Sequence, residues 1–227
     1  MKNKNIYIFN ACCIVLTIIL IIFSHFFLFE KFVWLSLLSD FATLFGVIYN
    51  SLLLTNEKYG MHFGIANNIC LGIFCLLQRV WFTAAYSLIY CIPSLIYGIY
   101  LQRNVKSSEV VVIKRLTNTQ IILSILYWFL MVIVLSLILL ILKGNLWYLD
   151  ALLNTSLLVS LFLLTRGYYH SYYYFMIGIV FAVILYSLLA FQEISNLTML
   201  IMWVLYFAGA LVGLNSWKNK YKRQNKC

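Results

Sequence analysis

Long uncharged runs constrain this chain more than any other feature. They occupy residues 5–29, 59–78, 80–102, 116–142, 167–192 and 194–217. Each run is about as long as the roughly 20 apolar residues that a helix needs to cross a bilayer core. The whole chain is 64% hydrophobic and 10% charged, whereas a soluble domain is about a quarter charged. The sequence therefore predicts an all-α polytopic membrane protein.

Eight transmembrane helices are expected once the two segments that carry a single acid are added. We predict them at 6–28, 32–54, 61–78, 82–101, 121–142, 146–164, 172–191 and 197–216. The longest connection, residues 102–120, is too short for a separate soluble domain.

The basic residues indicate how the helices are oriented. With eight crossings, thirteen Lys and Arg residues lie on the side of both termini and only Lys31, Arg79 and Lys143 lie on the other side. The positive-inside rule then predicts cytoplasmic termini. The net charge of +10 is therefore an orientation signal and not an indication of nucleic-acid binding.

Two segments have the same acid at the same place. Asp40 leads to Leu-Leu-Thr at 53–55, and Asp150 leads to Leu-Leu-Thr at 163–165, with equal spacing. The chain contains only six acids, and an acid within a membrane segment usually has a role. The pair indicates duplication, with a first repeat at 32–101 and a second repeat at 146–216.

The two repeats define a domain order. We predict an N-terminal helix within 1–31, the first repeat, a loop and linker helix in 102–145, the second repeat, and a basic tail at 217–227. The first helices of the two repeats are four crossings apart, so the repeats point the same way. Parallel repeats of this kind occur in transporters, with the substrate site between the halves near the midplane.

Four stretches carry a resemblance to a known family. They are 150–166 followed by an aromatic-rich helix, Phe63 to Asn67, Pro93 with Gly98, and Met202 to Tyr206 ending at Gly213 and Trp217. In order and spacing they resemble the PnuC vitamin transporters, whose best-known substrate is nicotinamide riboside. The resemblance implies a three-plus-one-plus-three fold similar to the SWEET sugar transporters.

The resemblance also implies facilitated diffusion, with a separate cytoplasmic kinase that phosphorylates the substrate and so traps it in a bacterial cell. Four positions depart from the family pattern of Gln, Gln, Trp and Asn, namely Leu95, Leu161, Phe175 and Ile179. A thiamine, a riboflavin or a deoxynucleoside is therefore as consistent a substrate as one resembling nicotinamide riboside.

Polar side chains in the helices are the first candidates for substrate contact. Asp150 is interpreted either as a polar gate or as a structural partner of helix ends. Asn154 lies one turn further on the same face. Asn67 is the matching candidate on the third helix, because an amide both donates and accepts hydrogen bonds.

Aromatic side chains form the second group of candidates, because they stack on planar heterocycles. Those at repeat-matched or family-matched places are Phe63, Tyr90, Tyr97, Tyr172, Phe175 and Tyr206. Packing between helices is the competing interpretation for each. Pro93 is the one proline in the chain and predicts a kink in the fourth helix.

No catalytic motif, metal site or cofactor is expected. The cysteines lie mainly within apolar helices, the three histidines are isolated, and no phosphate-binding loop is present. The predicted partners are a small vitamin or nucleoside, the lipid bilayer and a kinase, and a homo-oligomer is compatible with the sequence. The alternatives are a binding subunit of an ATP-driven importer, a receptor, or a membrane-bound enzyme.

Overall fold

A computed structural model describes residues 4–27, 34–54, 59–104 and 113–224 of the 227 residues. This part of the chain is helical apart from turns and one isolated β-bridge between Lys114 and Tyr168. The elements are α1 (Lys4–Phe27), α2 (Trp34–Leu54), α3 (Gly60–Leu77), α4 (Trp81–Ala85), the π-helix η1 (Tyr86–Cys91), α5 (Ile92–Asn104), α6 (Asn118–Ile141), α7 (Trp147–Thr165), α8 (Ser171–Gln192), the 3₁₀ turn η2 (Ile194–Asn196) and α9 (Leu197–Gln224).

The elements form eight helical rods, meaning continuous runs of helix, because α4, η1 and α5 follow one another without a break. Within the described residues, six helices are long and apolar enough to cross a membrane: α2, α3, α6, α7, α8 and α9. The other two rods contain shorter apolar stretches, Tyr7–Phe23 and Trp81–Ile96. A helix satisfies its own backbone hydrogen bonds, which a bilayer core cannot do. The all-helical polytopic prediction is therefore confirmed.

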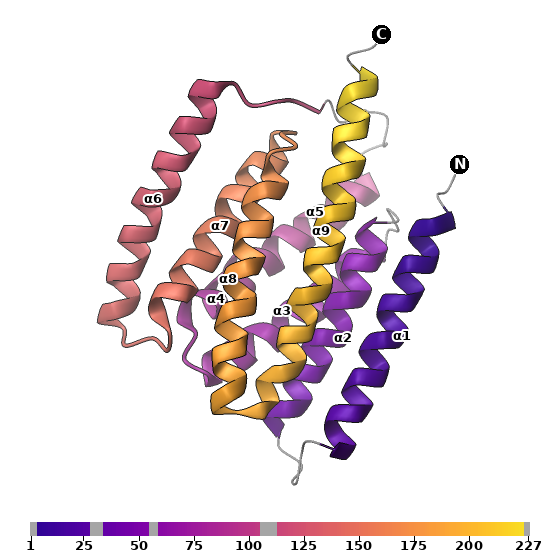
Figure 1. Cartoon of the computed structure of the whole chain (residues 1–227), viewed down its shortest axis with the longest axis vertical. Coiled ribbons are helices and arrows are strands. Elements are labelled where there is room, and N and C mark those ends of the chain that lie inside the picture. The colour runs from indigo at the N-terminus through magenta and orange to yellow at the C-terminus, as the bar shows by residue number, and fades with distance from the viewer. Residues whose placement is uncertain (1–3, 28–33, 55–58, 105–112, 225–227) are drawn as a thin grey trace.

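Helix α1 begins and helix α9 ends at the same end of the bundle (Figure 1). We call it the basic end, because Lys114, Arg115, Arg166 and Lys218 belong to the segments that meet there. The opposite end contains the starts of α2, α4, α7 and α9 and is called the far end.

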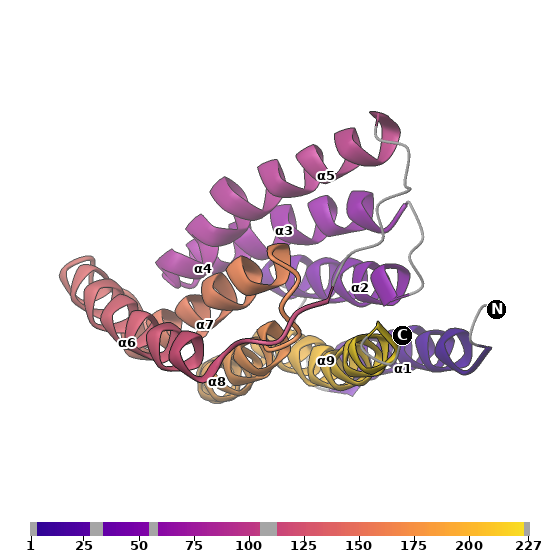
Figure 2. The same cartoon turned by 90° about the horizontal axis from the view of Figure 1, so that it is seen from above.

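Helices α3 and α8 organise the packing. Helix α3 packs against α2 and against the α4–η1–α5 rod, and α8 packs against α7 and α9. The two groups of helices, α2 to α5 and α7 to α9, meet where α2 packs along α9 and where α7 contacts α4. Helices α1 and α6 lie at opposite edges of the bundle, α1 on α2 and α9, and α6 on α7 (Figure 2).

The main core is built from residues of α2, α3, α4, α7, α8 and α9. Its fully buried members include Phe74 of α3, Leu153 of α7, Tyr186 of α8 and Met202 of α9. Helix α6 contributes little, since Leu135 and Leu139 are its buried residues. Its other faces are apolar and exposed, as expected for a helix surrounded by lipid.

A π-helix interrupts the fourth rod where the sequence predicts a proline kink. The Ile92 N–H bonds to the Ser87 carbonyl, five residues back, and Pro93 follows with no N–H to donate. The wider π-helical turn accommodates the break in backbone hydrogen bonding that the proline imposes. π-Turns and prolines are both recognised causes of helix bending.

Two far-end turns use a non-glycine residue in a left-handed conformation. Arg79 follows α3 with φ of 58°, and Lys143 follows α6 with φ of 51°. After α6, the Lys143 N–H bonds to Leu140 O at 3.1 Å and the Gly144 N–H to Leu139 O at 3.1 Å. This is the Schellman pattern, in which glycine is preferred at the left-handed position.

Replacing Lys143 with glycine is expected to raise the free energy of unfolding by about 0.5–1 kcal/mol. The left-handed conformation costs a non-glycine residue about 1–2 kcal/mol, part of which is offset by the greater flexibility of glycine in the unfolded chain. Thermal unfolding in detergent measures the change. Lys143→Ala is the control, because it removes the same charge and keeps the strain. An equal gain in both variants would assign the effect to charge.

At the basic end, the segment after the long loop packs on the turn between α7 and α8. The Lys114 N–H bonds to Gly167 O at 2.8 Å, and the Leu116 N–H bonds to the Nδ1 atom of His170 at 3.3 Å. Thr117 then starts α6 with a capping box, in which Thr117 and Gln120 bond to each other's backbone N–H. These contacts attach the lipid-exposed α6 to the second repeat.

His170 makes this attachment sensitive to pH. Burial lowers the pKa of His170 from its usual 6.5, and the positive charges of Arg115 and Lys218 lower the pKa further. The unfolded chain therefore takes up the proton first as the pH falls. The stability due to neutral His170 is complete above about pH 6.5 and is lost as the pH falls through the lowered pKa.

We expect the melting temperature of the protein to fall between pH 7 and pH 5, and to fall less in His170→Gln. Glutamine keeps an acceptor for the Leu116 N–H but does not titrate. The comparison of the two melting curves over this range checks the prediction. Identical pH slopes would show that other groups control the acid response.

Candidate functional site

Asp150 joins the start of α7 to the start of α4. Its side chain is 1% exposed. Its Oδ2 atom accepts the Phe82 N–H at 2.8 Å, and its Oδ1 atom accepts the Thr83 N–H at 3.0 Å and the Thr83 hydroxyl at 2.6 Å. Val80, the N-cap residue of α4, makes no side-chain cap. Asp150 of α7 therefore caps α4, where backbone N–H groups need acceptors.

Asn154 belongs to the same cluster. Its Nδ2 atom lies 2.7 Å from Thr83 Oγ1 and 2.7 Å from Asp150 Oδ1. It is fully buried, and its Oδ1 atom has no hydrogen-bond partner among the described residues. The amide nitrogen is thus occupied by the cap, and the carbonyl oxygen is the part of Asn154 that remains to bind another group.

Further hydrogen bonds join α2 and α3 to α8 and α9 toward the far end. They are Cys75 with Tyr186 at 3.2 Å, Gln78 to Glu193 at 2.8 Å, and Ser39 with Thr198 at 2.6 Å. The bond between Ser39 and Thr198 resembles the cap at α4, because it also connects the starts of two helices, here α2 and α9. Polar contacts therefore hold the repeats together at this end of the bundle.

A second polar cluster lies near the middle of α2, α3 and α9. A Cβ atom placed on Gly46 would lie 2.6 Å from Tyr206 Oη, 2.8 Å from Met202 Sδ and 3.0 Å from Asn67 Oδ1. The oxygens of Asn67 and Tyr206 are buried and have no hydrogen-bond partner within the described part of the chain. We call Gly46, Asn67 and Tyr206 the glycine junction.

Close contacts continue from the glycine junction toward the basic end. A Cβ atom on Gly209 of α9 would meet the Nδ2 atom of Asn50 of α2. A Cβ atom on Gly64 of α3 would lie 2.9 Å from the Tyr49 ring and 3.1 Å from Leu95 Cδ1. Leu95 and Tyr49 therefore lie beside each other at Gly64.

The remaining aromatic candidates are spread over the bundle. Phe63 lies one turn before Asn67, with its ring 6.2 Å from that of Phe45. Tyr90 is 42% exposed and stacks on Tyr86 in the π-helix at 5.5 Å. The structure does not describe the side chain of Tyr97.

Tyr172 and Phe175 lie on α8. Tyr172 packs against the backbone at Gly213 and edge-on against Trp217 at 5.6 Å. Phe175 is partly buried against the main core. One turn further, Ile179 is fully buried.

Of the nine predicted site residues, two pairs come together: Asp150 with Asn154, and Asn67 with Tyr206. Sequence reasoning missed Thr83 and Gly46, one at the centre of each cluster. Thr83 matches Thr198 at the repeat offset of 115 residues, so the duplication contained a signal for it. A single glycine such as Gly46 has too many explanations in a membrane helix to be chosen from sequence.

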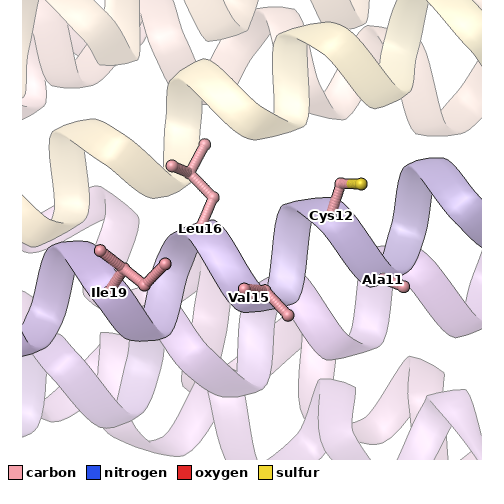
Figure 3. A pocket seen from close by; sticks show the side chains of 5 residues that line it. All are labelled: Ala11, Cys12, Val15, Leu16 and Ile19. Carbon is pink, nitrogen blue, oxygen red and sulfur yellow. The ribbon is translucent and has the colours of Figure 1, made fainter.

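A groove of about 360 Å³ runs along the surface of α1 (Figure 3). Its lining side chains carry no charge, amide or hydroxyl: Ala11, Cys12, Val15, Leu16 and Ile19. Such a surface suits lipid chains and offers no hydrogen bonds to a polar solute. Among the described residues, no group of three or more His, Cys, Asp or Glu residues could hold a metal ion.

One family model and one solved structure are similar to this chain. The family model for the nicotinamide mononucleotide transporter matches residues 36–219. Among solved structures, the crystal structure of the vitamin B3 transporter PnuC is similar, with a TM-score of 0.77 and 16% sequence identity. The similarity covers 97% of this chain and 93% of that chain. Comparison with the curated proteins finds no match.

Proposed function

Because the chain belongs to the nicotinamide mononucleotide transporter family, we propose that it imports a small vitamin or nucleoside by facilitated diffusion. The family match, which extends over both repeats, is the observation that carries the proposal. The substrate resembles nicotinamide riboside, thiamine, riboflavin or a deoxynucleoside. It is not altered in transit, and a cytoplasmic kinase traps it after entry.

The proposed mechanism is alternating access between the two parallel repeats in a three-plus-one-plus-three core preceded by α1. The distribution of polar contacts along the bundle supports alternating access. Hydrogen bonds join the repeats toward the far end, whereas the glycine junction in the middle has two buried oxygens without partners. We therefore assign substrate contact to the middle of the bundle and closure to the far end.

The substrate contacts are proposed from this division. Asn67 and Tyr206 bind polar groups of the substrate, and Phe63, Tyr90, Tyr97, Tyr172 and Phe175 are the aromatic candidates for contact with its ring. Asp150 and Asn154 hold the outer closure through their bonds to Thr83. The basic end faces the cytoplasm of a bacterial cell, as the positive-inside rule requires.

Uptake by purified protein in liposomes tests the proposal. We expect radiolabelled nicotinamide riboside, thiamine, riboflavin or thymidine to equilibrate across the membrane without an ion gradient or another subunit. A binding subunit of an ATP-driven importer, or a receptor, binds a compound without flux, and an enzyme changes it chemically. Absence of flux for all four compounds would contradict facilitated diffusion.

A further inference from the structure

The glycine junction brings atoms of three helices to one point. Gly46 lies near the middle of α2, Asn67 near the middle of α3, and Tyr206 in the apolar part of α9. Since α2 and α3 belong to the first repeat and α9 to the second, the junction crosses the interface between the repeats. In this conformation the oxygens of Asn67 and Tyr206 occupy the space that a side chain at position 46 would take.

Both oxygens lack a conventional hydrogen-bond partner among the described residues. Buried polar groups are nearly always hydrogen-bonded, so each exception needs an explanation. Leucine and phenylalanine would fill the same space without leaving a polar atom unpaired. Thr43, one turn before Gly46 on α2, adds a third buried oxygen without a partner.

We propose that Asn67 and Tyr206 together bind a hydroxyl group of the transported molecule, which takes the place of the Gly46 contact when the repeats separate. The inference rests on the proposed transport function and specifies which part of the substrate is recognised. A ribose or another polyol chain supplies such a hydroxyl.

The hydrogen-bond donors and acceptors of the two side chains match a neutral hydroxyl group. Asn67 Oδ1 can only accept a hydrogen bond, whereas the Tyr206 hydroxyl both donates and accepts. A hydroxyl satisfies both by donating to Asn67 and accepting from Tyr206. An ammonium group would donate to both oxygens and leave the Tyr206 hydroxyl hydrogen without an acceptor, and a carboxylate cannot donate to Asn67 Oδ1.

The surrounding charge agrees with a neutral ligand group. Helix α3 and residues 197–217 of α9 contain no charged side chain. Asp40, the one charged residue of α2, lies six positions before Gly46, nearly two turns away. None of the three helices therefore places a counter-ion next to the junction for a charged ligand group.

The absence of a side chain at Gly46 explains how a ligand group fits. A Cβ atom on Gly46 would lie within 3.0 Å of both oxygens and of the Met202 sulfur, so alanine would crowd the junction. With glycine, the space beside the α2 backbone becomes available to a ligand hydroxyl once the two oxygens move away. Glycine is the residue that permits close approach of backbone to a ligand.

The first test removes one hydroxyl. Binding of riboflavin, nicotinamide riboside and thymidine to purified protein is measured by thermal stabilisation and titration. Tyr206→Phe is expected to weaken binding about tenfold, the effect of one lost hydrogen bond, without lowering the melting temperature of the ligand-free protein. Tyr186→Phe is the matched control, because its hydroxyl bonds to Cys75. It is expected to lower the melting temperature and leave the affinity unchanged.

The second test removes the hydroxyls from the ligand. Lumichrome, nicotinamide and thymine contain the same rings without a ribityl chain or sugar. We expect the wild type to bind these rings more weakly than it binds the parent compounds. We also expect Tyr206→Phe to bind the rings as tightly as the wild type does. Gly46→Ala is expected to weaken binding of the parent compounds, whereas Gly72→Ala, which meets only Leu88, leaves it unchanged.

Equal affinity of wild type and Tyr206→Phe for all three parent compounds would overturn the inference. So would equal binding of the parent compounds and their rings, or no binding of any probe. These results are independent of flux. A protein that binds as expected but does not transport in liposomes would contradict the proposed function and leave the hydroxyl subsite in place.

Discussion

Replacing Asp150 with alanine is expected to lower the free energy of unfolding by about 3–5 kcal/mol, because several buried donors lose their acceptor at once. The two backbone N–H groups of Phe82 and Thr83 lose their acceptor in a buried place. Thr83 and Asn154 still bond to each other, which limits the loss. Denaturant or thermal unfolding in detergent measures the change.

Two variants serve as controls for Asp150→Ala. Asp150→Asn keeps one acceptor oxygen and is expected to lose about half as much stability. Glu193→Gln removes an exposed acid at the same end of the bundle and keeps an acceptor for Gln78, so we expect a change within about 0.5 kcal/mol. If Asp150→Ala were as stable as Glu193→Gln, the cap would have no energetic importance.

Replacing Gly178 with leucine is expected to lower the free energy of unfolding by about 2–4 kcal/mol. A Cβ atom on Gly178 would lie 3.2 Å from Ser156 Cβ and 3.3 Å from Leu153 O. These atoms cannot move away without displacing α7, so a leucine forces α7 and α8 apart. The unfolding midpoint in detergent measures the loss.

The neighbouring residue provides the control for Gly178→Leu. Ile177 is 42% exposed, and Ile177→Leu adds the same side chain one position earlier on the same helix. We expect that variant to unfold like the wild type. If both variants were neutral, the close approach of α7 and α8 at Gly178 would not contribute to stability.

The number and order of the helices could be predicted because charges mark the ends of membrane helices. Helix α7, expected at 146–164, spans Trp147–Thr165, and α8, expected at 172–191, spans Ser171–Gln192. The end of α9 was placed too early, at residue 216. The basic residues after it continue the helix to Gln224, since cations are favourable at a helix C-terminus.

The partners of the buried polar residues could not be predicted. A membrane helix is apolar on all sides, so it has no polar stripe to indicate which face meets which neighbour. Asp150 was recognised from its rarity, but its acceptor role depends on Thr83 of another helix. Tyr206 was chosen from its place in the repeat, and its convergence with Asn67 on Gly46 depends on how α2, α3 and α9 cross.

The capping of α4 by Asp150 of α7 has a consequence for how the protein is made. Asp150 follows Thr83 by 67 residues, so a ribosome has synthesised both α5 and α6 before the acceptor for α4 emerges. During that interval the first α4 amides must bond to water or to the translocation machinery. The N-terminal half of the chain cannot reach its final form before α7 is inserted, and the two halves mature together.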